Sequence, residues 1–483
     1  MNTDIDAAVH AILAGPKGPR IGAFFDFDGT LIHGYSAAVY FVDRLRRGEV
    51  GAGDLLDIVR MAAKGDPDPA EFADLIGKGI AEWAGRSEQE LAELWARLFE
   101  QKIAARLFPE AWKLVKAHQK MGHTVAVASS ATSYQVAPAA AELGITQLLC
   151  TQAMVRRGRL TGGIQGEPLW GTAKADAVRA FAKANRITLS RSHGYANGNE
   201  DIAFLQAVGQ ATAVNPKPPL RQVAEREGWK VMRFASRGRP SVTTLVRTAA
   251  AWAGFAATVA GGLAYAKAGG DKTRAADIVG SVGSDAVLSL AGIELEVSGE
   301  RHLWEHRPAV FIFNHQSNVD GYVVLSLTRR GVAGVAKKEA AAMPVVGTYL
   351  RLAQVVFIDR ANSANAIEAM RPLVQRLQEG TSILISPEGT RSRSPRLGRF
   401  KKGAFHLARQ AGVPVVPIVI RNAGEVMARD SLLMRSGKVQ VCVLPPIDVA
   451  AWSAGDFDDH VSGVRSLFQQ TLDHWPVAEG GTR

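Results

Sequence analysis

Two carboxylates follow a hydrophobic segment near the start of the chain. The sequence FFDFDGT (24–30) places Asp26 and Asp28 two residues apart, just before Gly29. At that spacing on a strand, both side chains point the same way until the glycine turns the chain. One carboxylate can attack phosphorus while the other donates a proton to the leaving group, and Mg²⁺ would screen the nucleophile from the phosphate. The two acids alone also fit a solvated turn, but the apolar segment before them favours a site.

A histidine and an aspartate follow another apolar run in the second half of the chain. The sequence NHQSNVD (314–320) comes directly after AVFIF and places His315 five residues before Asp320. Across a turn, the carboxylate can fix the imidazole tautomer and leave the other ring nitrogen to deprotonate a substrate hydroxyl. A surface histidine beside an ordinary acid at a helix N-terminus is the alternative interpretation of this motif taken alone.

Cations end the apolar segments that follow. Arg360 ends FIDR (357–360), and Arg391 lies in PEGTRS (387–392), where a guanidinium can make a bidentate contact with phosphate. The segment VPVVP (413–417) carries two prolines and therefore predicts an edge strand or a site wall.

A basic run extends from Arg391 to Lys402, with six basic residues and no acid. Such a run attracts phosphorylated substrates, an acidic membrane surface or nucleic acid, or it is a solvated loop. The sequence has no zinc-like Cys/His spacing and no RNA-binding aromatic motif, so we expect no nucleic-acid partner.

Length and composition restrict the class of protein. The chain has 483 residues, 47% of them hydrophobic and 21% charged, which indicates several globular domains rather than disorder. Cys150 and Cys442 are its two cysteines, which excludes a disulfide scaffold and suits a reducing compartment. The first 20 residues contain charges and Pro16 but no continuous apolar core, so we do not expect a secretory signal.

Apolar strand candidates alternate with helical patterns in both halves. They lie at 21–27, 124–129 and 192–197 in the first half, and at 309–314, 354–359, 382–388 and 413–420 in the second. This alternation predicts an α/β fold with a mostly parallel sheet in each half. Ligands bind outside the carboxyl ends of strands in such sheets, where the acids and the histidine fall.

The segment between the halves is unusually apolar. Thr248–Ala266 has no charged residue across 19 positions and is flanked by Arg247 and Lys267. It is just long enough to span a bilayer but is rich in alanine and glycine, which drive insertion weakly. A second apolar stretch, 278–293, carries an aspartate. We therefore favour a membrane-embedded or interfacial helical pair over a buried soluble helix or a true span.

The first half resembles the haloacid dehalogenase superfamily of phosphatases, most closely its phosphoserine-phosphatase-like branch. Besides the two acids, Ser129 with Ser130 matches the phosphate-binding hydroxyl, Lys174 matches the phosphate-neutralising lysine, and NGNED (197–201) matches the acidic metal-binding loop. The resemblance implies a Rossmann-like domain over 20–240 with a helical cap at about 35–105. It also implies a Mg²⁺ site made by these residues: Asp26, Asp28, Asn197 and Asp201.

Asn197 departs from this family's pattern, because family members usually carry an aspartate there. An amide oxygen can still ligate Mg²⁺, but it brings no charge. The sequence therefore leaves open whether the domain is an active phosphatase or a degenerate, regulatory one.

Residues 285–450 resemble the glycerophospholipid acyltransferase family, which includes the 1-acyl-sn-glycerol-3-phosphate acyltransferases. The four blocks described above occur in the order typical of that family. The resemblance implies that His315 is the general base and Asp320 its partner. It implies an acyl-CoA or acyl-ACP donor and a phosphate-acceptor site formed by Arg360, Glu388, Gly389, Thr390 and Arg391, with Lys337 or Lys338.

The whole chain is similar to bifunctional fusion proteins of bacterial lipid metabolism. We therefore expect a membrane-associated connector at 245–293, an acyltransferase domain at 294–455 and a location on the cytoplasmic face of a membrane. The expected reaction converts lysophosphatidic acid to phosphatidic acid, beside a magnesium-dependent phosphatase. The alternative is another lysophospholipid or a glycolipid acceptor, with a regulatory phosphatase-like domain.

Overall fold

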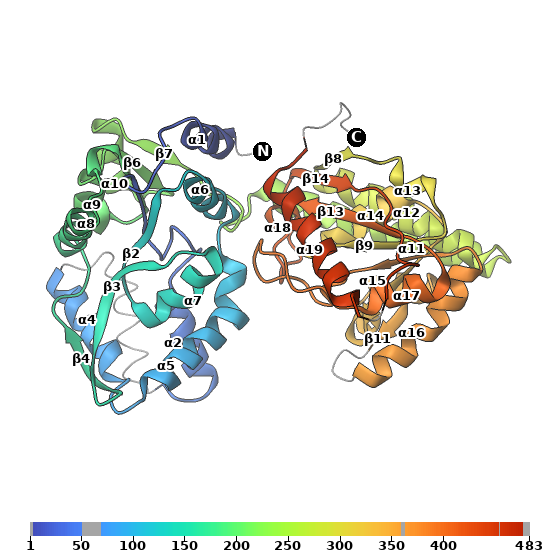
Figure 1. Ribbon diagram of the computed structural model, residues 1–483, viewed down its shortest axis with the longest axis horizontal. Coiled ribbons are helices and arrows are strands. Elements are labelled where there is room, and N and C mark those ends of the chain that lie inside the picture. Colours follow the sequence, from blue (N-terminus) through green and yellow to red (C-terminus); the bar gives the residue numbers. More distant parts are fainter. Residues whose placement is uncertain (1–2, 51–68, 359–362, 454, 477–483) are drawn as a thin grey trace. The chain divides into compact units, whose positions relative to one another are not determined.

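The computed structural model forms two compact units, one ending at Arg239 and the other beginning at Pro240. The residues it describes are 3–50, 69–358, 363–453 and 455–476. Within the described residues, each unit contains one seven-stranded sheet with helices packed against it (Figure 1). Both units are α/β folds, which confirms the predicted fold class.

The sheet of the first unit has the strand order β4-β3-β2-β1-β5-β6-β7. Every neighbouring pair is parallel except β3 and β4. The strands are β1 (Gly22–Phe25), β2 (Thr124–Thr132), β3 (Gln147–Arg156), β4 (Arg159–Gln165), β5 (His193–Ala196), β6 (Gln210–Val214) and β7 (Lys230–Met232). Because β1 is central, the residues after it lie between the carboxyl ends of β2 and β5.

Both faces of this sheet are covered. Successive strand residues point to opposite faces, so Phe25 packs in one core cluster and Phe24 in another. The helices α1 (Thr3–Leu13), α6 (Pro109–Lys120) and α7 (Ser133–Leu143) contribute to the first cluster, and α8 (Thr172–Ala184), α9 (Ile202–Gln206) and α10 (Pro218–Arg226) to the second. This double burial explains why the strands are continuously apolar.

Further helices lie between β1 and β2 in the sequence, namely α2 (Ser36–Arg46), α4 (Pro69–Ala81) and α5 (Glu88–Leu98). They enclose an aromatic cluster of Tyr40, Trp83 and Trp95, with ring centroids 5.5–6.3 Å apart. The start of α5 is fixed by a capping box, in which Ser87 and Glu90 satisfy each other's backbone amides.

The sheet of the second unit has the order β11-β10-β12-β9-β13-β14-β8. All neighbouring pairs are parallel except β13 and β14. The strands are β8 (Ile293–Ser298), β9 (Val310–Phe313), β10 (Val332–Lys337), β11 (Val356–Ile358), β12 (Ser382–Ile385), β13 (Val415–Arg421) and β14 (Gly437–Val443). The carboxyl ends of β12 and β13 therefore flank the end of β9.

The predicted edge strand at 413–417 is wrong, because β13 lies inside the sheet between β9 and β14. The Pro417 carbonyl accepts from Leu444 N at 2.9 Å, just beyond the last β13–β14 pair of Ile418 with Val443, so this residue faces the point where β14 ends. Its missing N–H therefore falls where the ladder with β14 ends.

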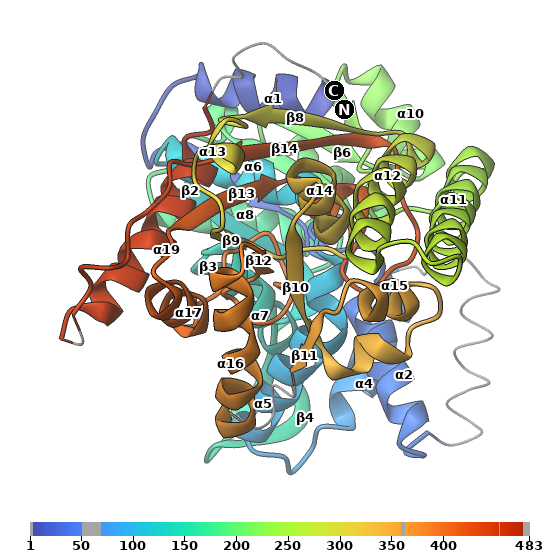
Figure 2. The same cartoon turned by 90° about the vertical axis from the view of Figure 1, so that its right-hand side faces the viewer.

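Helices also cover both faces of the second sheet (Figure 2). One core cluster includes residues of α11 (Val242–Lys267), α12 (Lys272–Ala291), α14 (Val319–Thr328) and α15 (Val346–Leu352). The other includes residues of α16 (Ser363–Gln378), α17 (Gly403–Ala411) and α19 (Phe457–Asp473).

The apolar segment between the halves forms α11, which packs along α12 within the second unit. Phe255 and Val259, four residues apart, are buried on its inner side. A Cβ at Gly283 would lie 3.1 Å from the Phe255 ring, so this glycine permits the close approach of the two helices. Among the described residues, α11 is the helix that is long and apolar enough to cross a membrane. In its most apolar stretch, 22% of the residues are buried.

Candidate active sites

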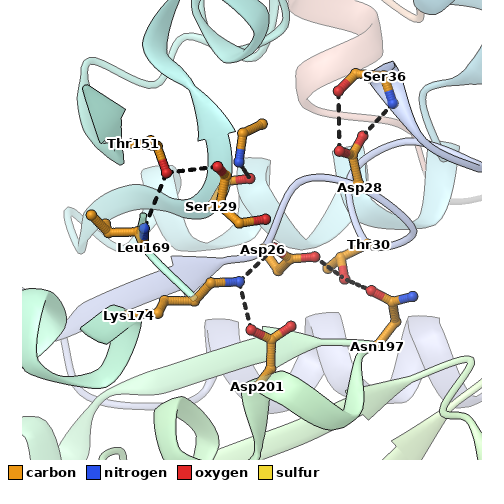
Figure 3. Close-up of polar contacts among 12 residues, drawn as sticks. Asp26, Asp28, Thr30, Ser36, Ser129, Thr151, Leu169, Lys174, Asn197 and Asp201 are labelled. Carbon is orange, nitrogen blue, oxygen red and sulfur yellow. Dashed lines mark hydrogen bonds and ion pairs between the residues drawn. The ribbon is translucent and has the colours of Figure 1, made fainter. Parts of the chain in front are cut away.

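The first site lies where β1, β2 and β5 end (Figure 3). These strands are neighbours, so their ends bring Asp26, Ser129 and Asn197 to one edge of the sheet. Lys174 in the first turn of α8 and Asp201 before α9 complete the group. The structure thus gathers side chains that are widely separated in the sequence.

Lys174 joins the two acids of this site. Its Nζ lies 2.9 Å from Asp26 Oδ1 and 2.5 Å from Asp201 Oδ1, and all three side chains are buried. Burial alone would lower the pKa of Lys174, but the two carboxylates outweigh it and raise that pKa above its ordinary value. The lysine is therefore a fixed positive charge beside Asp26.

Asn197 and Asp26 both contact the Thr30 hydroxyl. Thr30 Oγ1 is 3.3 Å from Asp26 Oδ2 and 3.3 Å from Asn197 Oδ1. Gly29 has φ +82°, and a Cβ there would lie 2.2 Å from Asn197 Nδ2, so the approach of the asparagine requires glycine. Asp201 Oδ2 is buried and has no hydrogen-bond partner in the described structure. The unpaired oxygen and the carboxylate and amide oxygens around it fit a hard cation such as Mg²⁺.

The Asp28 side chain does not join this group. Its carboxylate accepts from Ser36 N at 2.7 Å and Ser36 Oγ at 3.0 Å, and it points away from Asn197 and Asp201 (Figure 3). Burial raises the pKa of Asp28 to about 7. A carboxyl with that pKa can both give and take a proton near neutral pH, as acid–base catalysis requires.

The end of β2 is held by a residue that sequence reasoning missed. Thr151 Oγ1 donates to the carbonyl of Ser130 at 2.7 Å and accepts from Leu169 N at 3.0 Å. Ser129 Oγ is buried and accepts from Ala131 N at 3.1 Å. Thr151 therefore helps to fix the end of β2, which carries the predicted phosphate-binding hydroxyls.

The second site begins where β9 ends, with His315 and Asp320. The His315 Nδ1 atom lies 2.8 Å from Asp320 Oδ2, which also accepts from Gln316 N at 2.7 Å and Ser317 N at 2.8 Å. Because a carboxylate can only accept, Nδ1 carries the proton and Nε2 presents a lone pair. Asp320 is fully buried, whereas the His315 side chain is 24% exposed. The imidazole is thus oriented and accessible, as a general base must be.

Glu388 follows β12 and braces this histidine. Glu388 Oε1 accepts from His315 N at 2.8 Å, and Oε2 accepts from Gly398 N at 2.8 Å. Glu388 is 6% exposed, and burial raises its pKa to about 7. Both carboxylate oxygens are therefore engaged by the backbone of the site.

Arg391 lies close to the histidine loop. Its Nη1 donates to Asn318 Oδ1 at 2.9 Å and to the carbonyl of Arg429, and the next residue, Ser392, donates its N–H to the His315 carbonyl at 2.6 Å. Gly389 makes the preceding turn with φ +70°, and Thr390 is exposed. The segment 389–392 thus contacts the 315–318 loop and brings the Arg391 guanidinium to Asn318, three residues after the histidine.

Comparison with known proteins shows the family of the domain that contains the second site. An acyltransferase family model matches residues 294–421, which include His315 and Asp320. The 1-acyl-sn-glycerol-3-phosphate acyltransferase of Limnanthes alba is 34% identical over 202 residues, which cover 42% of this chain and 71% of that protein. The chain belongs to this acyltransferase family. The resemblance found in the sequence is therefore confirmed.

The acyltransferase also carries a hydrolase domain. A haloacid dehalogenase-like hydrolase model matches residues 23–206. A putative hydrolase of Mycobacterium tuberculosis (strain CDC 1551 / Oshkosh) is 33% identical over 245 residues, which cover 48% of this chain and 79% of that protein. Among solved structures, the 1-acyl-sn-glycerophosphate acyltransferase of Thermotoga maritima is 24% identical with a TM-score of 0.41, covering 49% of this chain and 98% of that one. The chain is a fusion of the two domains.

Arg429 stands beside Arg391 in the acyltransferase domain, and no sequence motif pointed to it. Its buried Nε has no hydrogen-bond partner in the described structure and lies 3.8 Å from Asp430 Oδ1. Burial lowers the pKa of Arg429, Asp430 opposes that shift, and the nearby Arg391 and Arg393 add to it. Three guanidinium groups near one carboxylate form an environment that an anionic phosphate would stabilise.

Two of the remaining predicted acceptor residues, Lys337 and Lys338, lie away from the histidine loop. Lys337 and Lys338 are exposed at the carboxyl end of β10, separated from β9 by β12. Arg360 lies outside the described residues. The structure therefore brings Glu388, Gly389 and Arg391 together with the histidine and leaves the two lysines at a neighbouring strand end.

Proposed function

We propose that the acyltransferase domain moves a fatty acyl group from acyl-CoA or acyl-ACP to lysophosphatidic acid and forms phosphatidic acid. The main support for the proposal is the accessible His315 imidazole, which Asp320 fixes, on a loop whose Asn318 accepts from Arg391. The imidazole can take a proton from a hydroxyl, and the Arg391 guanidinium can bind a phosphate. Lysophosphatidic acid bears both groups. The family relatives named for this reaction support the same choice of acceptor.

The reaction needs one proton acceptor and no covalent enzyme intermediate. His315 Nε2 takes the proton of the acceptor hydroxyl as its oxygen attacks the thioester carbonyl. The new C–O ester bond forms, the C–S bond breaks, and the imidazolium returns the proton to the leaving thiolate. Asp320 stabilises the imidazolium, and Glu388 holds the His315 backbone in place. Arg391 and Arg429 bind the acceptor phosphate in this scheme.

We further propose that α11 docks this domain on the cytoplasmic face of a membrane. Val242, Leu245 and Val246 at the start of α11 are 76%, 51% and 62% exposed. A patch of exposed apolar side chains indicates a surface that contacts a membrane or a partner. A lysophospholipid keeps its acyl tail in the bilayer, so a docked enzyme meets its acceptor there. The basic run from Arg391 to Lys402 would add attraction to anionic lipids.

We propose that the hydrolase domain is a magnesium-dependent phosphomonoesterase. Asp26 attacks phosphorus, Asp28 protonates the leaving oxygen, and Lys174 neutralises charge at the nucleophile. Asp28 then takes a proton from the water that cleaves the phospho-aspartate and releases phosphate. Mg²⁺ held by Asp26, Asn197 and Asp201 would supply charge screening of the phosphate.

A second candidate for this domain is regulation without catalysis, and Asn197 is the observation that favours it. The asparagine removes one negative charge from the oxygen cluster, which weakens cation binding. In that case the acyltransferase keeps its chemistry and acts on lysophosphatidic acid, another lysophospholipid or a glycolipid.

The acceptor is identified by incubating the purified chain with labelled acyl-CoA or acyl-ACP and a panel of lysolipids. We expect labelled phosphatidic acid from lysophosphatidic acid, and little product from acceptors without a phosphomonoester. Preferential labelling of a choline or ethanolamine lysophospholipid would contradict the proposed acceptor. The same assay compares the two donors directly.

A further inference from the structure

Three histidines of the hydrolase domain gather at the end of the sheet opposite Asp26 and Asn197. His118 lies near the end of α6, His123 directly precedes β2, and His193 is the first residue of β5. One ring nitrogen from each lies within 4.8 Å of those from the other two. These residues belong to no motif singled out in the sequence, and the proposed reactions do not use them.

The hydrogen bonds of two of these histidines define which nitrogens face inward. His118 Nδ1 and His123 Nδ1 face each other at 2.8 Å. Their outer nitrogens contact oxygen atoms, His118 Nε2 with Tyr195 Oη at 2.9 Å and His123 Nε2 with the Pro16 carbonyl at 2.8 Å. Because a carbonyl can only accept, His123 carries its proton on Nε2, and its Nδ1 lone pair points at His118.

We propose that this cluster is a binding site for a borderline divalent transition-metal ion such as Zn²⁺, ligated by His118 Nδ1, His123 Nδ1 and one ring nitrogen of His193. Without metal, His118 Nδ1 donates its proton to His123 Nδ1. When the ion binds, that proton moves to His118 Nε2, which then donates to Tyr195 Oη. No proton leaves the site in this exchange, because one neutral tautomer replaces another.

The outer contacts match those of known metal-binding histidines. A ligating imidazole almost always donates its second N–H to a carbonyl, a carboxylate or water, which fixes the ring orientation. The Pro16 carbonyl already plays that part for His123, and the Tyr195 hydroxyl oxygen is in position to do so for His118. The oxygen atoms that would orient the two ligating rings are therefore already in place.

The ligand set and its spacing favour zinc-like ions over Mg²⁺. Three imidazole nitrogens suit Zn²⁺, Cu²⁺ or Ni²⁺, whereas Mg²⁺ requires oxygen ligands. Zn–N bonds of about 2.0–2.1 Å in a tetrahedron separate two nitrogens by roughly 3.3 Å, so the two Nδ1 atoms need to part by about half an ångström.

The third ligand is also available to the ion. Within the described residues, the His193 ring nitrogens make no hydrogen bond, and its ring lies 4.6 Å from that of His118 between centroids. His193 is half-buried, so an ion can enter from solvent and keep water at a fourth position. A bound ion would cross-link α6, the start of β2, β5 and, through His123, the segment at Pro16.

The test is metal binding by the untagged, metal-stripped full-length chain. We expect Zn²⁺ titration calorimetry to give a site that His193→Gln and His123→Gln each weaken by about tenfold or more. The exposed His10→Gln is the matched control and should bind as wild type does. Bound Co²⁺ should show the intense visible bands of tetrahedral nitrogen ligation, which an octahedral oxygen site at Asp26 does not give.

A melting curve without metal separates binding from folding. The half-buried His193→Gln is expected to melt close to wild type without metal and to lose the stabilisation that Zn²⁺ gives wild type. Wild-type protein that binds no Zn²⁺ at this site would overturn the proposal and leave a neutral hydrogen-bonded network. The same conclusion follows if His193→Gln and His123→Gln bind with wild-type stoichiometry and affinity.

Discussion

The carboxylate of Glu388 accepts the backbone N–H of His315 at 2.8 Å, and this contact joins the ends of the neighbouring strands β12 and β9. The other carboxylate oxygen holds Gly398 N. Each carboxylate oxygen of Glu388 is thus held by one backbone N–H group. We therefore infer that the part of Glu388 in acyl transfer is to position the histidine.

Replacing Glu388 with glutamine should impair catalysis more than binding. The amide places an NH₂ group against one of two backbone N–H groups, so one charged hydrogen bond worth roughly 1.5–3 kcal/mol is lost. We expect kcat to fall by about 10- to 100-fold with little change in the acceptor KM. Steady-state kinetics check this, and a raised KM with normal kcat would indicate direct contact with the acceptor.

The same variant should change how stability depends on pH. Burial raises the pKa of Glu388 from 4.5 to about 7, so the folded state holds this proton more tightly than the unfolded state. The resulting stability is full below pH 4.5 and is lost as pH rises through about 7. Wild type should lose roughly 2–3 kcal/mol between pH 5 and 8 that Glu388→Gln does not lose.

Chemical unfolding at the two pH values checks this linkage. Glu379→Gln, at an exposed position of the same unit, is the matched control and should follow wild type. Parallel pH profiles for wild type and Glu388→Gln would contradict the linkage.

Arg391 and Arg429 should both support binding of the acceptor phosphate. Loss of a charge-assisted bidentate contact costs on the order of 2–4 kcal/mol, so Arg391→Ala should lower acceptor kcat/KM by roughly 30- to 1000-fold. We expect a smaller loss of about tenfold for Arg429→Ala, which removes one donor group. The donor KM should change little, and the exposed Arg409→Ala should have no effect. If both variants keep the wild-type acceptor kinetics, Arg391 and Arg429 do not bind the acceptor phosphate.

Membrane docking should depend on the exposed start of α11. Phe255 packs on Tyr322 with ring centroids 5.2 Å apart, so deleting the helix would open the core. Changing Val242, Leu245 and Val246 together to serine leaves that packing intact. We expect binding to vesicles containing phosphatidic acid to fall by roughly tenfold or more in sedimentation assays.

The matched control for docking changes Val42 and Val231 to serine, since both are exposed valines of the hydrolase domain. That variant should sediment with vesicles as wild type does. If the α11 variant binds vesicles as strongly as wild type, the exposed start of α11 does not dock the protein on membranes.

Asn197 should set the magnesium requirement of the hydrolase domain. Asn197→Asp restores one negative charge to the oxygen cluster, so we expect it to lower the magnesium concentration needed for phosphomonoester hydrolysis. Asp26→Asn should abolish hydrolysis at any magnesium level, because the nucleophile is lost. A magnesium titration of the full-length chain measures both. No hydrolysis by wild type or Asn197→Asp across several substrates would favour the regulatory role.

Sequence patterns predicted much of both sites because short motifs at strand ends carry them. Asp26 follows β1 and His315 follows β9, and the topology of a parallel sheet brings such residues to one edge. The HxxxxD spacing also predicted the 2.8 Å contact of His315 with Asp320, because a single turn joins the two residues.

Features that depend on long-range packing could not be predicted in this way. Arg429 reaches Arg391 across 38 residues through a loop without a motif. The prolines of 413–417 suggested an edge strand, because sequence does not reveal that Pro417 falls where the ladder with β14 ends. The Asp28 carboxylate binds Ser36 and does not point the same way as Asp26, because β1 ends at Phe25, before both acids, so the side-chain alternation of a strand does not apply to them.

Acyl transfer by the His315→Ala protein tests whether His315 is the general base. In the proposed reaction His315 is the base, and it lies in a different compact unit from Asp26, so we expect the two activities to separate. With labelled acyl thioester and lysophosphatidic acid, we expect the folded variant to form almost no phosphatidic acid and to keep any phosphomonoesterase activity of wild type. Asp320→Asn should be nearly as damaging, because the imidazole loses its orienting carboxylate. Substantial phosphatidic acid formation by folded His315→Ala would show that His315 is not the general base.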